Sequence, residues 1–138
     1  MTVKNSIVGD LTYDYGWRKK EEITFWNRRE EVEINFIAYG EEKVNSTQEE
    51  EYTWLKNNLL EVEKNSLEEI KEYISEEYKL NYSEEKIMEE IRITEIIFER
   101  DEESIGLVFQ WDYDLENGIG VRIKNKSIFE IGFESMVM

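Results

Sequence analysis

The chain has 138 residues with 33 acidic and 17 basic side chains, a formal net charge of −16, and it contains no cysteine, histidine or proline. Without cysteine or histidine it cannot form a disulfide, a Ser-His-Asp or Cys-His catalytic arrangement, or a histidine-ligated zinc or iron site. The acidic balance disfavours binding to the phosphate backbone of DNA or RNA. A hydrophobic content of 40% nevertheless predicts a folded chain rather than a disordered acidic one.

The length predicts one domain over residues 1–138, large enough to bury an ordinary hydrophobic core. No apolar run approaches the roughly 18 residues of a membrane span, and the N-terminus has no apolar stretch typical of a signal peptide. We therefore expect a cytoplasmic domain that does not enter a membrane and uses no cofactor.

Three segments before residue 40 alternate apolar and polar side chains, which is the pattern of half-buried strands. They are Gly9–Tyr15, Glu22–Trp26 and Val32–Ala38. Turn-like residues separate them at Tyr15-Gly16 and at Asn27-Arg28-Arg29. Links this short favour an antiparallel meander.

After residue 45 the apolar residues follow helical spacing. Ser46 with Glu49, and Ser66 with Glu69, match the capping box, in which a hydroxyl and a carboxylate satisfy backbone donors at a helix start. We expect one helix to begin at each of these serines and a shorter one at Ser83. The first two carry an apolar stripe and a Glu-rich outer face, which predicts that both lie across a sheet.

Residues 93–133 return to the strand pattern, with a hairpin around Asn117-Gly118. A two-residue turn there would pair Tyr113 with Arg122 and bury neighbouring carboxylates. A three-residue loop, Glu116–Gly118 with Gly118 in the left-handed conformation, instead pairs Tyr113 with Val121, Trp111 with Ile123 and Asp112 with Arg122. We predict the second register, because it keeps the apolar side chains on one face.

The order of these elements predicts an α+β fold. Its antiparallel sheet would contain three N-terminal strands and about four C-terminal strands, with the central helices packed on one face. The last strand is expected at Ile128–Phe133.

Few motifs point to catalysis. The chain has neither a GxxxxGK[ST] nor a GxGxxG phosphate-binding loop. The segment from Asp112 to Gly118 resembles the start of a calcium loop, but the sixth and twelfth positions are Asn117 and Ile123 instead of glycine and glutamate, so we predict no metal site. Among 33 acids, pairs suited to carboxylate catalysis would occur by chance. A carboxylate-based or divalent-metal-dependent enzyme is therefore the alternative hypothesis.

Two acidic runs are candidates for binding a partner. Acidic groups beside aromatic side chains suit a Lys/Arg-rich protein, because complementary charge accelerates association and selects the partner. The competing interpretation is that these acids only protect sheet edges from aggregation or keep the surface solvated. The candidate partner-binding residues are Asp101, Glu102, Glu103, Asp112, Asp114 and Glu116.

Both ends of the chain carry a family resemblance. The residues that carry it are Gly9–Asp14, Trp111–Asp114, Glu116–Arg122 and Phe129–Gly132. They resemble an uncharacterised family of small bacterial proteins, whose members are similar to domains found beside polymorphic toxin genes. The resemblance implies an immunity protein that binds and neutralises a basic toxin, and it supplies no catalytic residues. We therefore expect a non-catalytic protein-binding domain, with its oligomeric state left open.

Overall fold

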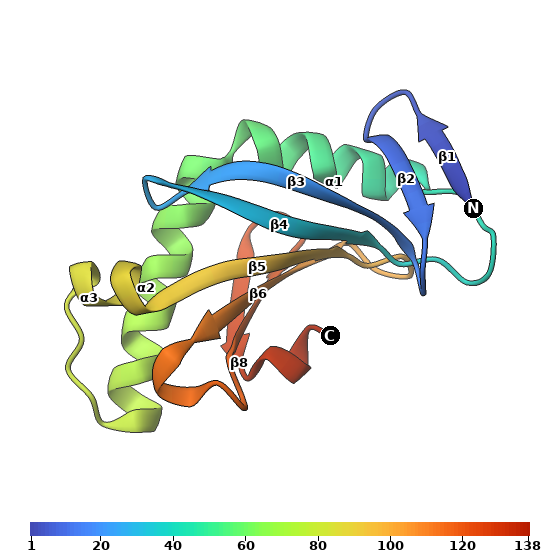
Figure 1. Cartoon of the computed structure of the whole chain (residues 1–138). Coiled ribbons are helices and arrows are strands. Elements are labelled where there is room, and N and C mark those ends of the chain that lie inside the picture. Colours follow the sequence, from blue (N-terminus) through green and yellow to red (C-terminus); the bar gives the residue numbers. More distant parts are fainter.

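The computed structural model describes all 138 residues as one eight-stranded sheet with three α-helices (Figure 1). The strands lie side by side in the order of the chain: β1 (Thr2–Asn5), β2 (Gly9–Tyr13), β3 (Trp17–Phe25), β4 (Arg28–Phe36), β5 (Ile91–Phe98), β6 (Ser104–Trp111), β7 (Ile119–Lys124) and β8 (Ile128–Gly132). Helices α1 (Ser46–Asn57), α2 (Leu59–Tyr78) and α3 (Glu84–Glu90) connect β4 to β5.

The predicted α+β class is confirmed, with two corrections to the sheet. Four strands precede the helices instead of three, because the segment Thr2–Asn5 pairs with β2. This segment has no buried side chain, so its sequence does not show the alternation of a strand. The sheet is also mostly rather than wholly antiparallel. The helical connection returns the chain beside β4 in the same direction, so β4 and β5 are parallel.

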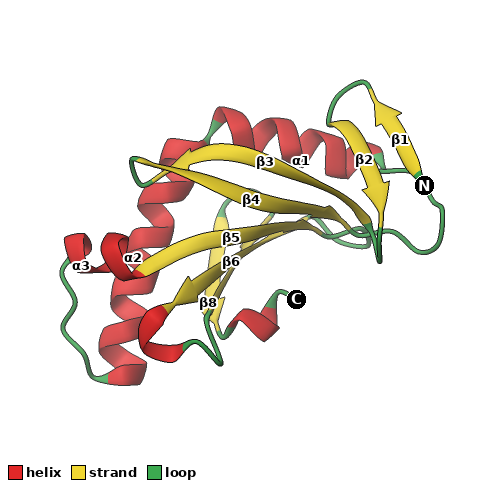
Figure 2. Ribbon diagram, viewed as in Figure 1, coloured by secondary structure: helices red, strands yellow, loops and turns green.

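The helices cover one face of the sheet, as Figure 2 shows for α1 and α2 behind the strands. A core of 27 buried residues joins that face to the inner sides of α1 and α2. A smaller cluster of Ile97, Val108 and Val137 lies on the other face, where the C-terminal 3-10 turn η2 (Glu134–Met136) packs. None of the three helices combines the length and apolar content needed to cross a bilayer.

Two of the three predicted helix starts are correct, because α1 begins at Ser46 and α3 follows Ser83. Ser83 caps α3, accepting a hydrogen bond from the Lys86 backbone N–H at 3.1 Å. At α1 the capping box lies one residue earlier than predicted, because the Asn45 side chain and Gln48 form it. No helix begins at Ser66, which is buried in the middle of α2. The break between the helices falls at Asn58 instead, and the buried face of α2 runs from Val62 through Ser66 to Ile74.

The predicted hairpin register is wrong. Leu107 pairs with Val121, and Ile105 rather than Trp111 pairs with Ile123. Residues after Trp111 leave the sheet in the 3-10 turn η1 (Asp112–Asp114), which lengthens the loop. The shift between Trp111 and Ile105 is an even number of residues, so the side chains that remain within β6 and β7 still face the predicted way. The predicted pairing of Asp112 with Arg122 is therefore also wrong.

Candidate functional site

The two acidic runs predicted to bind a partner lie at opposite ends of β6. Residues Asp101–Glu103 precede this strand, and Asp112–Glu116 follow it. At about 3.3 Å per residue, the eight residues of β6 separate the runs by roughly 26 Å. The six acids therefore form two separate surfaces.

The run Asp101–Glu103 makes contacts within the molecule. The Tyr39 hydroxyl donates a hydrogen bond to Asp101 at 2.6 Å, and Glu103 forms an ion pair with Lys126 at 3.5 Å. Glu102 is exposed. Two of the three carboxylates are thus already engaged by neighbouring loops.

The run after β6 is fixed in place by its middle carboxylate. Asp114 accepts a hydrogen bond from the Tyr78 hydroxyl at 2.6 Å and another from the Asn117 side chain at 3.0 Å. These two donors hold the pKa of Asp114 below its usual value. Asp112 and Glu116, on either side, are exposed and form no hydrogen bond or ion pair. One carboxylate therefore anchors the turn and leaves the other two free.

Exposed apolar side chains lie between the free carboxylates. Tyr113 is 59% exposed and Leu115 is 62% exposed. The Tyr113 ring stacks on the fully buried Trp111 ring with 5.1 Å between centroids, and the edge of Tyr78 meets Trp111 at 4.7 Å. This packing limits the motion of Tyr113 without covering it. We call the four exposed residues Asp112, Tyr113, Leu115 and Glu116 the tip.

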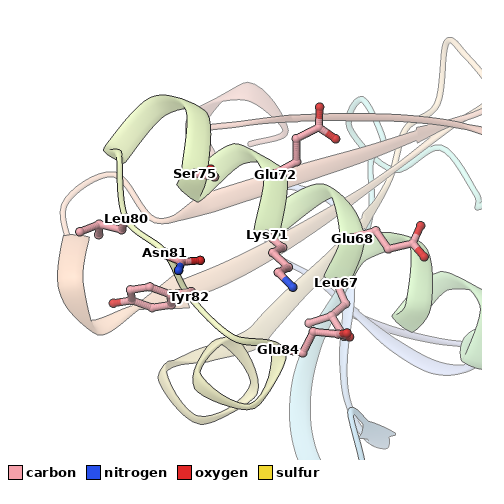
Figure 3. A pocket seen from close by; sticks show the side chains of 9 residues that line it. All are labelled: Leu67, Glu68, Lys71, Glu72, Ser75, Leu80, Asn81, Tyr82 and Glu84. Carbon is pink, nitrogen blue, oxygen red and sulfur yellow. The ribbon is translucent and has the colours of Figure 1, made fainter.

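A groove of about 370 Å³ lies beside the tip, between α2 and the loop that follows it (Figure 3). Lys79 ends α2 in the left-handed conformation, and the loop then runs back along the helix. Tyr82 in this loop also contacts the buried Trp111, at 5.9 Å between ring centroids. Tyr82 from the groove and Tyr113 from the tip therefore both pack against Trp111.

The charge of this surface is strongly unbalanced. The groove carries Glu68, Glu72 and Glu84 against the single base Lys71. The tip and its anchor add three more carboxylates and no base. Such a surface attracts cationic groups over a distance comparable to the Debye length, about 8–10 Å at moderate salt.

The carboxylates of the groove do not converge. Figure 3 shows the side chains of Glu68, Glu72 and Glu84 pointing in different directions. In the whole chain, no group of three acidic, histidine or cysteine side chains is placed to hold a metal ion. The alternative hypothesis of a carboxylate enzyme thus has an acidic groove, but no pair of acids aimed at a common point within it.

Sequence reasoning missed the cluster of tyrosines around Trp111. Tyr73, Tyr78 and Tyr82 follow one another at short intervals within a Glu-rich segment, a signal that was present in the sequence. The many glutamates of this segment instead favour a solvated helix face, which hides the signal of the tyrosines. Tyr78 and Tyr82 instead contact Trp111, and Tyr73 contacts Tyr78.

Comparison with known families gives one match. A family model described as Domain of unknown function (DUF6985) matches residues 7–138, so the chain belongs to that family. No curated protein and no solved structure matches the chain significantly.

Proposed function

We propose that this member of the DUF6985 family is a non-catalytic protein-binding domain that binds a basic protein through the tip and the adjoining groove. The observation that carries the proposal is the tip itself. Tyr113 and Leu115 stand largely exposed between the free carboxylates of Asp112 and Glu116, on a turn that Asp114 fixes to α2.

This arrangement suits a binding contact for energetic reasons. Tyrosine is enriched at interface positions that dominate the binding energy, because it buries a large apolar area and offers a hydroxyl. Tyr113 already rests on Trp111, so it loses little conformational freedom when a partner covers it. The carboxylates on either side add charge complementarity, which raises the association rate and selects a basic partner.

A more specific form of this proposal is that the protein is a bacterial immunity protein. Residues Trp111–Asp114 and Glu116–Arg122, which carry the resemblance to domains beside toxin genes, are the segments that build the tip and the strand behind it. An immunity protein neutralises its toxin by covering it. A basic toxin is the partner that the acidic tip and groove would suit.

A pull-down with matched charge variants tests this proposal. The tagged protein is incubated with lysate of its own source cells at low and at high salt, and bound proteins are identified by mass spectrometry. We expect a basic protein that is recovered at low salt and weakened by high salt. The double variant Asp112→Asn with Glu116→Gln is expected to recover less of it.

The control removes the same charge at the other end of β6. Glu41 and Glu102 are exposed and form no ion pair, so Glu41→Gln with Glu102→Gln makes an equal change of net charge there. This variant is expected to recover the partner as the unmodified protein does. Equal loss by both variants would indicate unspecific attraction to a −16 chain and would contradict the proposal, as would recovery of no basic protein.

A further inference from the structure

A cleft of about 470 Å³ lies between the turn that joins β3 to β4, the start of α2 and helix α3, and it shares no residue with the groove beside the tip. Its apolar walls are the side chains of Trp26, Leu59, Leu60 and Met88. Leu60 is 82% exposed, which places the cleft at the surface. Glu63 is the only charged residue that lines it, so the cleft is apolar except for one carboxylate.

Two hydrogen bonds from Trp26 fix the turn to α2. The Trp26 backbone N–H donates to Oε1 of Glu63, and the indole Nε1–H donates to the Glu63 backbone carbonyl at 3.0 Å. Trp26 and Asn27 both have positive φ, at 49° and 63°, a conformation that a bulky side chain rarely adopts. Such a conformation persists only where the surrounding contacts hold it. This wall of the cleft is therefore already formed without a ligand.

The Glu63 carboxylate has no cation as a partner. The residue is only 8% exposed, its Oε2 atom makes no hydrogen bond, and it forms no ion pair with a lysine or arginine. Burial raises the pKa of Glu63, and the hydrogen bond from the Trp26 backbone N–H offsets this only in part. A nearby cation favours the ionised form of a buried carboxylate. The cleft thus offers an anionic group that the protein itself leaves without a counter-charge.

We propose that this cleft binds a small organic amine in its ammonium form, with an apolar part at least as large as a phenyl ring. The ammonium group pairs with the Glu63 carboxylate, and the apolar part lies against Trp26, Leu60 and Met88. An apolar pocket with a few polar groups that fix orientation is the usual form of a small-molecule site, and 470 Å³ falls within the usual range of about 300–1,000 Å³.

Charge and size together select this class of ligand. An anion would meet a carboxylate of like charge, and a neutral molecule would cover that carboxylate without supplying a counter-charge. The lysine side chain of a protein carries the same ammonium group, but its thin methylene stem would fill only a small part of the cleft. Because an apolar cavity of about 150 Å³ accommodates benzene, 470 Å³ leaves room for an aromatic or branched group.

The test is a titration at neutral pH followed by two-dimensional amide NMR. The probes are phenethylamine, phenethyl alcohol, sodium hydrocinnamate and a lysine residue blocked at both backbone ends. We expect phenethylamine to shift the amide signals of Asn27, Leu60 and Met88 and to bind at least about fivefold more tightly than the alcohol, with hydrocinnamate weakest. Absence of shifts at these amides, equal affinity for the amine and the alcohol, or a blocked lysine that binds as tightly as phenethylamine would overturn the proposal.

Two glutamate variants separate the contribution of Glu63 from the attraction of any cation to a chain with net charge −16. In Glu63→Gln the amide oxygen can still accept the hydrogen bond from Trp26, so we expect phenethylamine to bind about fivefold more weakly and phenethyl alcohol to bind unchanged. Glu61→Gln makes the same charge change at an exposed position of α2. That variant should bind both probes as the unmodified protein does. An equal loss of phenethylamine binding in both variants, or no loss in Glu63→Gln, would refute the role of Glu63.

Discussion

A buried glutamate on α1 should make the stability of this protein depend on pH. Glu51 is only 1% exposed, and its Oε1 atom has no hydrogen-bond partner. The nearest charges are Glu103, Lys126 and Glu99, so the lysine is outnumbered by acids. Burial, with a smaller contribution from Glu103, raises the pKa of Glu51 from 4.5 to about 8. The folded protein therefore keeps this carboxyl protonated at neutral pH.

The direction of the effect follows from proton binding. Between the unfolded pKa of 4.5 and the folded pKa of about 8, the folded state holds a proton that the unfolded state has released. The free energy of unfolding is thus unaffected by Glu51 below the unfolded pKa and falls as the pH rises toward the folded one. From about pH 5.5 to about pH 8.5 this loss amounts to about 3 kcal/mol, at about 1.4 kcal/mol per pKa unit.

The variant Glu51→Gln measures this loss directly. The glutamine side chain is neutral at every pH. The difference in free energy of unfolding between the variant and the unmodified protein is measured at two pH values, and any effect of the amide that does not depend on pH cancels between them. Urea unfolding at about pH 5.5 and about pH 8.5 should show that difference increasing by about 3 kcal/mol. The exposed neighbour Glu50, changed to Gln, should show no such increase. A gain for Glu51→Gln that is the same at both pH values would refute the reasoning.

Two further substitutions test how the fold is held together. Gln48 is fully buried and donates hydrogen bonds to the backbone carbonyls of Ile37 at 2.9 Å and Phe98 at 3.0 Å. Gln48→Leu leaves both carbonyls without this donor, so it should lower the free energy of unfolding, measured with urea, by about 2–4 kcal/mol. A change below about 1 kcal/mol would contradict that role. A Cβ atom at Gly120 would lie 2.7 Å from the Phe133 carbonyl, so Gly120→Ala should displace the C-terminal turn and accelerate hydrogen exchange at its backbone amides. Unchanged exchange there would show that the turn accommodates the methyl group.

Periodicity predicted the parts of the fold that burial determines. Val32, Ile34 and Phe36 alternate on β4 as expected, and Ile70 and Ile74 face the core from α2. The strand β1 gave no such signal, because its side chains are mostly exposed and it is held mainly by backbone pairing with β2. The sequence also did not predict that β4 and β5 are parallel, because the direction of β5 depends on how the three helices between these strands cross the sheet.

Local motifs were less reliable when two of them competed. Asn45 offers a capping side chain one residue before Ser46, and the asparagine forms the box with Gln48. At Ser66 the capping pattern was outweighed by tertiary packing, because Ser66 lies on the buried face of α2 between Val62 and Ile70. The predicted left-handed Gly118 is present, with φ +55°, but the turn Asp112–Asp114 ahead of it moved the register.

The acidic residues of the candidate surface could be predicted from the sequence, but their contacts with other parts of the chain could not. Asp112, Asp114 and Glu116 were named from sequence, but their unequal roles depend on the hydrogen bond between Asp114 and Tyr78 across 36 positions of the chain. The exposure of Tyr113 was likewise unexpected. Alternation placed it in the apolar face of a strand, and only the early end of β6 releases it.

The most direct test of the central claim is the affinity of the recovered partner for two tyrosine variants, measured by titration calorimetry. Tyr113 and Tyr39 are equally exposed, at 59%, and lie near opposite ends of β6, because Tyr113 follows this strand and Tyr39 contacts Asp101 before it. We predict that Tyr113→Ala weakens binding at least about tenfold, as expected for a central interface tyrosine, and that Tyr39→Ala leaves it unchanged. An affinity that is unaffected by Tyr113→Ala, or reduced equally by both variants, would contradict binding through the tip.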